Sequence, residues 1–131
     1  FCCGTNVIFR LDALHQVGGF DHTSVTEDFA TSFKLHSNKW SSDYVNKVGA
    51  FGMGPEDLGA FYKQQYRWAF GTISLFRVLV SSFIKNPRLF PAIRWYQYFL
   101  SGSYYFIGWI FFIIMIGPIL YILFEVPTYF A

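Results

Sequence analysis

The chain has 131 residues, of which 53% are hydrophobic, 23% are aromatic and 14% are charged. Soluble globular domains usually carry about 25% charged residues, so this composition indicates contact with a membrane. The formal net charge of +2 is too small to indicate a nucleic-acid-binding protein, and no interleaved array of basic and aromatic residues is present to hold a phosphate backbone. We therefore expect no nucleic acid among its partners.

The two cysteines, Cys2 and Cys3, are neighbours in the sequence, which excludes an ordinary structural disulfide between them. They have no metal-type spacing with a histidine either, so no metal site is expected within this chain. A reducing, cytosolic environment fits this pattern. The chain starts with Phe1 and carries no basic-then-apolar leader, so we expect it to be a fragment of a longer protein.

The first part of the chain shows the alternation of helices and strands that is typical of an α/β fold. Apolar runs bounded by turn residues predict short buried strands, and a run that ends at Gly18 predicts a short helix. The predicted strands cover residues 1–5, 7–9 and 40–45, and the predicted short helix covers residues 11–17.

A longer helix is predicted from about residue 24 to residue 38. Apolar residues recur at four-residue steps from Val25 to Phe33 and form a stripe along one face. Ser24 and Glu27 fit a capping box, which places the acidic residues in the first turn, where a carboxylate interacts favourably with the helix dipole. This interaction alone would explain the acidic residues without any role in chemistry.

Another helix is predicted after the glycine- and proline-rich loop at 52–55. Glu56 and Asp57 are expected in its first turn, and the helix is expected to run through Trp68 and to about Val80. Prolines and an asparagine between residues 86 and 91 then interrupt the chain.

No Lys, Arg, Asp, Glu or His occurs from Trp95 to Phe124. Residues 104–124 are apolar over a length of about 32 Å in a helix, which is enough to cross a bilayer. Pro118 is tolerated as a kink, so we predict a transmembrane helix at 104–124. The alternative is a buried helix of a soluble protein. The predicted organisation is a cytosolic domain at 1–85, an interfacial segment at 86–103, the transmembrane helix, and the start of a loop at 125–131.

The residues that flank the predicted transmembrane helix set its orientation. Lys85, Arg88 and Arg94 precede it, whereas only Glu125 follows it closely, so the preceding part of the chain is expected on the cytoplasmic side. Aromatic residues that suit the two membrane interfaces flank the helix, and they are Trp95, Tyr96, Tyr98, Tyr104, Tyr105 and Tyr129.

Three residues of the long helix could bind a nucleotide sugar. Gln64, Arg67 and Trp68 project from one face, because positions three and four apart are neighbours on a helix. Arginine suits phosphate oxygens, glutamine adds directional hydrogen bonds, and an indole ring stacks on a sugar. The alternative is an amphipathic helix with an arginine and a tryptophan at the membrane surface.

Asp28 could complement this set. The transfer of a sugar to a hydroxyl needs a carboxylate that accepts the hydroxyl proton, and it needs positive charge where the nucleotide diphosphate leaves. Asp28 and Arg67 supply one of each. A role of Asp28 in capping its helix remains the alternative.

Several short motifs follow one another in a familiar order over about the first seventy residues. They are Phe1-Cys2-Cys3-Gly4-Thr5, Arg10, Ala13-Leu14, Gly18-Gly19-Phe20, Thr26-Glu27-Asp28, Pro55-Glu56 and Gln64-x-x-Arg67-Trp68. In order and spacing this series resembles the processive, cellulose-synthase-like glycosyltransferases of family 2. The adjacent Cys2 and Cys3, and Thr5 after Gly4, depart mildly from the pattern.

The resemblance implies that residues 1–85 are the C-terminal part of a nucleotide-sugar-binding glycosyltransferase A-type domain. Asp28 would be the catalytic base that deprotonates the acceptor hydroxyl as it attacks the anomeric carbon of a UDP-sugar with inversion. Glu27 and Thr26 would complete the motif, on a helix that resembles the so-called finger helix of the family.

The resemblance also implies roles for the other motif residues. Gln64 and Arg67 would contact the UDP diphosphate. Trp68 would stack on the acceptor sugar at the mouth of a translocation channel, and Cys3 and Gly4 would line the acceptor site.

The implied partners are a UDP-sugar donor, a growing glycan acceptor, membrane lipid and possible accessory subunits. The family also implies a divalent metal, Mg²⁺ or Mn²⁺, whose ligands would lie outside this chain, so the fragment alone should be inactive. We expect an integral protein of the cell membrane, with its catalytic face cytoplasmic and UDP-glucose as its donor. Three alternatives stay open: a single-transfer lipid glucosyltransferase, a synthase of chitin, hyaluronan or poly-N-acetylglucosamine, and a non-catalytic membrane anchor.

Overall fold

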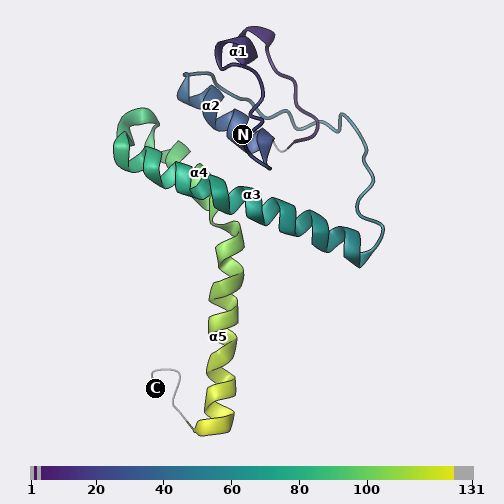
Figure 1. The fold of residues 1–131 in the computed structure, drawn as a ribbon, viewed down its shortest axis with the longest axis vertical. Helices are drawn as coiled ribbons and strands as arrows, with labels where there is room; N and C mark the ends of the chain where they lie inside the picture. The colour runs from purple at the N-terminus through teal and green to yellow at the C-terminus, as the bar shows by residue number, and fades with distance from the viewer. Residues whose placement is uncertain (1, 3, 126–131) are drawn as a thin grey trace.

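The computed structural model describes residue 2 and residues 4–125. The helices of this part are α1 (Leu11–Gln16), α2 (Glu27–Ser37), α3 (Leu58–Lys85), the 3-10 turn η1 (Pro87–Leu89), α4 (Ala92–Gly102) and α5 (Tyr104–Phe124). Figure 1 shows α1 and α2 on one side of α3, while α5 extends from the other side and runs across the direction of α3. The long α3 therefore separates two different parts of the molecule.

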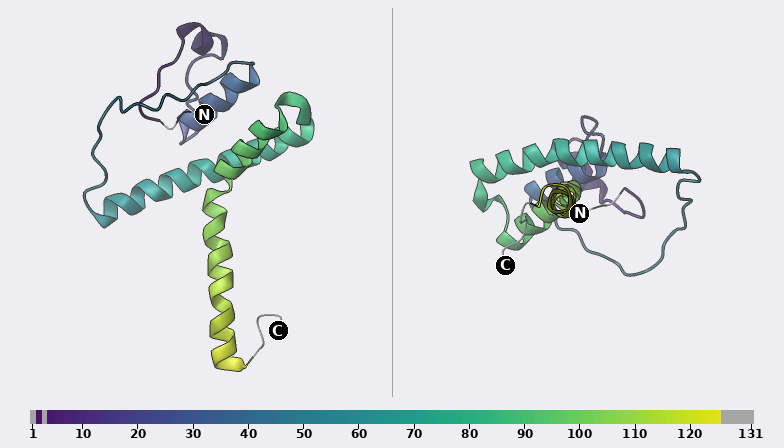
Figure 2. Two further views of the ribbon diagram at one scale, coloured as in Figure 1. Left: turned by 180° about the vertical axis from the view of Figure 1, so that it is seen from behind. Right: turned by 90° about the horizontal axis from the view of Figure 1, so that it is seen from below.

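The described residues contain no β-strand, so the predicted strands at 7–9 and 40–45 are absent from them and the α/β class is not confirmed. The predicted strand at 1–5 lies partly outside the described residues. A strand needs a neighbour to pair its backbone N–H and C=O groups. The chain between α2 and α3 instead runs as a wide loop that pairs with no strand among the described residues (Figure 2). Trp40 Nε1 at its start donates to Gln16 Oε1 of α1 at 2.6 Å, but Tyr44 further along is 90% exposed.

The predicted helix at 24–38 is present as α2, but its start differs from the prediction. Thr26 is the residue before the first turn, and no side-chain capping bond forms there, so the predicted capping box is wrong. Ser24 Oγ instead accepts a hydrogen bond from Thr26 N at 3.2 Å. The preceding turn is organised by Asp21 Oδ1, which accepts from Thr23 N at 2.8 Å and from Ser24 N at 3.1 Å. The Asp21 carboxylate thus organises the turn before α2, in place of the capping box that was expected from Ser24 and Glu27.

The long helix α3 begins later and ends later than predicted. Asp57 precedes the first turn, and its Oδ1 accepts a hydrogen bond from Ala60 N at 2.7 Å. Asp57 is therefore the N-cap, and Glu56 lies outside the helix, because a capping side chain satisfies a free N–H from the position before the first turn. The helix continues to Lys85, and the break at residues 86–91 is present as predicted.

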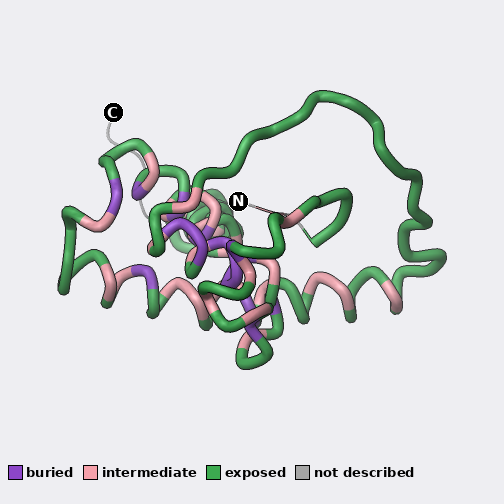
Figure 3. Tube along the Cα trace, turned by 90° about the horizontal axis from the view of Figure 1, so that it is seen from above, coloured by how far each residue is buried: buried purple, intermediate pink, exposed green. Residues whose placement is uncertain are grey.

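The core forms where α2, α3 and α4 meet, as Figure 3 shows by the gathering of buried residues. Its buried members are Phe29, Leu79, Phe90, Trp95 and Tyr98. Each such side chain stabilises the fold by about 1.5–3 kcal/mol when it leaves water. Trp95 and Tyr98 are 3% and 2% exposed, so the expectation that they lie among lipid headgroups is wrong. Trp95 Nε1 donates to Pro87 O at 2.9 Å, which replaces the expected headgroup contact.

Helix α5 covers the same residues, 104–124, as the predicted transmembrane helix. It is 21 residues long, the mean hydropathy of its most apolar 18-residue stretch is 2.5, and no part of that stretch is buried. Helix α3 is also long enough to cross a membrane, but the mean hydropathy of its most apolar 18-residue stretch is only 1.2. Since α3 carries charges and runs across α5, α5 is the better candidate for a membrane span.

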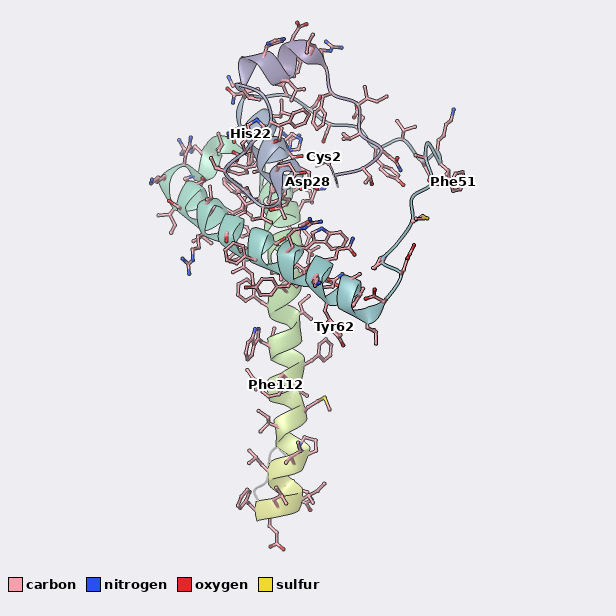
Figure 4. The ribbon with its side chains drawn as sticks, turned by 45° about the vertical axis from the view of Figure 1, so that its right-hand side comes forward. Cys2, His22, Asp28, Phe51, Tyr62 and Phe112 are labelled. Carbon is pink, nitrogen blue, oxygen red and sulfur yellow. The ribbon has the colours of Figure 1, made fainter. Side chains whose placement is uncertain are left out.

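The first turn of α5 is tied to α3. Tyr105 Oη donates to Gln65 Oε1 at 3.3 Å, and the rings of Phe106 and Phe76 pack with their centroids 5.4 Å apart. Of the aromatic residues expected at the membrane interfaces, Tyr104 is exposed and Tyr105 is half-buried, whereas Tyr129 lies outside the described residues. The remaining length of α5 projects alone, with Phe112 pointing outward (Figure 4).

Candidate active site

The start of α2 crosses α3 at a glycine. A Cβ atom at Gly71 would lie 2.6 Å from Thr26 Cγ2, 2.8 Å from Thr26 Oγ1 and 3.0 Å from Thr26 N. Real Cβ atoms do not approach other atoms so closely, so only glycine permits this contact. The first residue of the Thr26-Glu27-Asp28 motif is buried there and is held directly against α3.

The second predicted motif lies on the face of α3 that makes this crossing. Trp68, Arg67 and Gln64 precede Gly71 by three, four and seven residues, and these spacings place all four residues on one side of a helix. Gln64 is half-buried, Arg67 is exposed and Trp68 is 42% exposed. The crossing therefore brings the face that carries Gln64, Arg67 and Trp68 to the end of α2 that carries Asp28.

The carboxylate of Asp28 faces a glycine on the N-terminal segment. A Cβ at Gly4 would lie 3.1 Å from Asp28 Oδ2, and Gly4 has a φ of +78°. Asp28 Oδ1 accepts a hydrogen bond from Phe29 N at 2.8 Å, which leaves Oδ2 on the side of Gly4. A larger residue at position 4 would be strained and would crowd this oxygen. Glu27, the neighbour of Asp28, is exposed.

Cys2 ties the N-terminal segment to the first turns of α2. Its Sγ donates to Asp28 O at 3.0 Å and lies 2.9 Å from Ser32 Oγ, and Cys2 N donates to the same hydroxyl at 2.9 Å. Burial raises the pKa of the Cys2 thiol, which keeps the proton that these bonds need. Figure 4 shows Cys2 beside Asp28. Cys3, the predicted acceptor-site residue, lies outside the described residues.

The other end of α2 is held by a buried polar pair. His36 Nδ1 lies 2.6 Å from Tyr98 Oη on α4, and His36 Nε2 lies 3.0 Å from Ser42 Oγ. Burial, together with the nearby Arg94 guanidinium, lowers the pKa of His36 to about 4, so the ring is neutral near pH 7. Burial raises the pKa of Tyr98. This neutral network fixes α2 to α4.

A salt bridge connects α2 to the turn before it. Lys34 Nζ lies 2.6 Å from Asp21 Oδ2. The Lys34 ammonium and the hydrogen bonds from Thr23 hold the pKa of the Asp21 carboxyl well below its usual range. The turn that leads into Thr26 is therefore anchored by a carboxylate that stays ionised.

Sequence reasoning did not find Gly71 or Ser32 as parts of this arrangement, and it gave Cys2, a member of the N-terminal motif, no role of its own. A helical spacing of four residues does place Ser32 beside Asp28, so that neighbour could have been found. The contact at Gly71 depends on where two distant helices cross, and no local pattern signals it. Among the described residues, no group of three or more His, Cys, Asp or Glu side chains could hold a metal ion.

The comparisons of this chain with known proteins agree on one family. The family described as "Glycosyl transferase family group 2" matches residues 1–131. The chain is 33% identical to the UDP-forming cellulose synthase catalytic subunit of Dictyostelium discoideum, over 92% of this chain and 13% of the relative. It is 37% identical to the UDP-forming cellulose synthase catalytic subunit of Komagataeibacter sucrofermentans, over 68% of this chain and 11% of the relative.

A further relative is the "Putative cellulose synthase 2" of Komagataeibacter xylinus, which is 35% identical over 74% of this chain and 6% of the relative. The chain thus spans 13% or less of the length of these relatives. No solved structure matches the chain significantly.

Proposed function

Because the chain belongs to glycosyl transferase family group 2, we propose that it forms the acceptor side of the active site of a membrane-embedded, inverting glycosyltransferase. The enzyme would polymerise a β-linked, cellulose-like glucan from UDP-glucose. The observation that carries the proposal is the crossing of Thr26 and Gly71, which supports a shared site for Asp28 on α2 and for Gln64, Arg67 and Trp68 on α3.

Asp28 would be the catalytic base. Its Oδ2 atom, on the side of Gly4, accepts the proton of the acceptor hydroxyl as the hydroxyl oxygen attacks the anomeric carbon. The bond from that carbon to the UDP oxygen breaks, and its electron pair leaves with the diphosphate. Because the attack comes from the face opposite the leaving group, the configuration inverts. Glu27 and Thr26 would complete the motif, with Thr26 setting the position of the helix.

Gln64 and Arg67 would bind the diphosphate that leaves. The Arg67 guanidinium offers paired donors to phosphate oxygens, and the half-buried Gln64 offers its amide one turn away. The divalent Mg²⁺ or Mn²⁺ that the family resemblance implies would be held by residues outside this chain.

Trp68 would hold the acceptor sugar. Its indole ring is 42% exposed, which leaves a face free for a pyranose while the rest packs on the protein. The glycine backbone at position 4 and, by the resemblance of the motif, Cys3 would line the same acceptor site. The growing glycan would then lie between α3 and the N-terminal segment.

The extended segments of the chain support an α/β glycosyltransferase A-type domain in the full-length protein. Ile8 is 98% exposed and Phe51 is 96% exposed, although both are large apolar residues. Burial of such side chains is favourable, and the rest of the domain would cover them. We propose that residues 7–9 and 40–45 pair there with strands outside this chain.

Helix α5 supports the membrane placement that we propose. If α5 spans the bilayer, then α3 and α4, which run across it at one end, lie along the membrane surface. From residue 58 to residue 124 the chain contains Lys and Arg but no Asp or Glu. This positive charge favours a position of α3 and α4 on the cytoplasmic side. The active site would therefore face the cytoplasm, with α2 above α3 and lipid below it.

The test is incorporation of label from UDP-glucose, with other UDP-sugars in parallel, by membranes that contain the full-length protein. We expect label in a high-mass polymer, and we expect Asp28→Asn to lower it by about a hundredfold or more. Asp12→Asn, which removes an exposed carboxylate of α1, is the matched control and should retain activity.

Each other outcome has a definite meaning. Label that is extracted into chloroform as glycolipid would indicate a single-transfer lipid glucosyltransferase. Label from another UDP-sugar would indicate a different polymer, such as chitin or hyaluronan. Transfer that does not depend on Asp28 would contradict the assignment of the base.

A further inference from the structure

An open groove of about 420 Å³ lies along one side of α3. It is lined by Phe76, Arg77, Val80, Ser81, Ile84 and Lys85. These residues recur at spacings of one, three and four, so they form one continuous face of the helix. Its apolar surface comes from the phenylalanine, valine and isoleucine, and both cationic residues are exposed.

The groove lies on the side of α3 that faces away from α2. Leu79, which is 1% exposed, packs into the core with Phe29 of α2. At about 100° per residue, the middle of the groove lies nearly opposite Leu79 around the helix axis. Phe76, at one edge of the groove, packs on Phe106 in the first turn of α5. The groove therefore lies next to the contact between α3 and the first turn of α5.

The charge around the groove is uniformly positive. Residues 58–124 contain no Asp or Glu, and their cationic residues are Lys63, Arg67, Arg77, Lys85, Arg88 and Arg94. Within the described part of the chain the one ion pair joins Lys34 to Asp21, far along the sequence from the groove. The two cations of the groove thus lack an acidic partner among the described residues.

The chemistry of the groove complements that of an anionic phospholipid, because an apolar surface lies next to two cations that have no acidic partner in the described part of the chain. An acyl chain can lie against Phe76, Val80 and Ile84, while Arg77 and Lys85 contact the phosphate. Basic residues next to the cytoplasmic end of a membrane helix attract anionic lipid, and each contributes about 1 kcal/mol, or about fivefold in affinity.

We propose that this groove binds one anionic phospholipid of the cytoplasmic leaflet, with its headgroup on Arg77 and Lys85. The inference rests on the membrane placement given under the proposed function, but it does not depend on the sugar-transfer reaction. A bound lipid would hold α3 parallel to the membrane surface from the side opposite the active site.

The test uses the full-length protein in phosphatidylcholine nanodiscs that contain a trace of a photoreactive lipid, either phosphatidylglycerol or phosphatidylcholine. Labelled peptides are identified by mass spectrometry. We expect the phosphatidylglycerol probe to label residues 76–85 at least about fivefold more than the phosphatidylcholine probe does. Arg77→Gln/Lys85→Gln should remove this preference.

The matched control is Lys47→Gln/Lys63→Gln, which removes the same charge from exposed residues outside the groove and should keep the preference. Equal loss in both double variants would show a general basic surface and overturn the site. Absence of label at 76–85, as expected if another part of the protein covers the groove, would also overturn it. Transfer from UDP-glucose is measured on the same nanodiscs, so failure of the reaction is recognised separately from failure of lipid binding.

Discussion

Gly71 of α3 lies so close to Thr26 of α2 that a Cβ atom at position 71 would come within 2.6 Å of the threonine Cγ2. At this contact, two parts of the chain that are 45 residues apart in sequence set the distance between the side chains of the proposed site. The first prediction follows from it.

Gly71→Ala should push the start of α2 away from α3. We expect sugar transfer to fall by about tenfold or more, with a stability cost of about 1–3 kcal/mol from overpacking. Gly108→Ala is the control, because Gly108 is also helical and a Cβ there meets nothing within 4 Å. Full activity in Gly71→Ala would show that the crossing does not position Asp28.

Gly4→Ala should affect catalysis through the carboxylate it faces. The added Cβ would lie 3.1 Å from Asp28 Oδ2, so we expect kcat to fall by about tenfold or more through crowding of the proposed base. Backbone strain alone is controlled by Gly18→Ala, since Gly18 has a φ of +80° and open space around it. The same loss of kcat in both variants would mean that strain, and not contact with Asp28, is the cause.

Trp68→Ala and Arg67→Gln should separate the binding of the acceptor glycan from the binding of UDP. Loss of the indole ring should weaken use of an added acceptor glycan by about tenfold and change inhibition by UDP little. Loss of the guanidinium should weaken inhibition by UDP by about tenfold to a hundredfold, because hydrogen bonds to charged groups contribute about 1.5–3 kcal/mol. If each variant lost acceptor use and UDP binding equally, the assigned roles would be wrong.

His36 should make the protein less stable in mild acid. Its pKa is lowered from 6.5 to about 4 in the folded state by burial and by Arg94. Above pH 6.5 the ring is neutral in both states, whereas between pH 6.5 and about 4 the unfolded chain binds a proton that the folded chain does not. The free energy of unfolding therefore falls across this window, by at most about 3 kcal/mol.

Thermal unfolding of the full-length protein in detergent, at about pH 7 and about pH 5, measures this effect. His36→Gln should show a smaller change between the two conditions than the unaltered protein. His15→Gln, at an exposed position on α1, should behave as the unaltered protein does. An undiminished change in His36→Gln would assign the acid sensitivity to other groups.

The sequence predicted those elements whose signals are local. Residues 104–124 form a continuous helix because an uninterrupted apolar run, bounded by Ser103 and Glu125, needs no partner to define it. The stripe from Val25 to Phe33 predicted α2 for the same reason. The motif at Gln64, Arg67 and Trp68 also depends only on spacing within one helix.

The errors concern contacts between distant residues. Trp95 and Tyr98 are residue types of a membrane-interface belt, yet they are buried because Phe33 of α2 packs on both rings and Phe83 of α3 packs on Trp95. The predicted strands at 7–9 and 40–45 have the right residues for a sheet, but the described residues include no strand that could pair with their backbone.

The link between Tyr105 and Gln65 has a consequence for bilayers of different thickness. Helix α5 is about 32 Å long, close to the roughly 30 Å of a bilayer's hydrocarbon core, so an average membrane requires little tilt. In a thinner membrane α5 would tilt, and its first turn would pull on α3 through Tyr105 and Phe106. Because Gln65 is the chain neighbour of Gln64, this pull would act on the helix turn that carries the proposed diphosphate contacts. Membrane thickness would thereby set the height of the sugar-transfer site above the lipid.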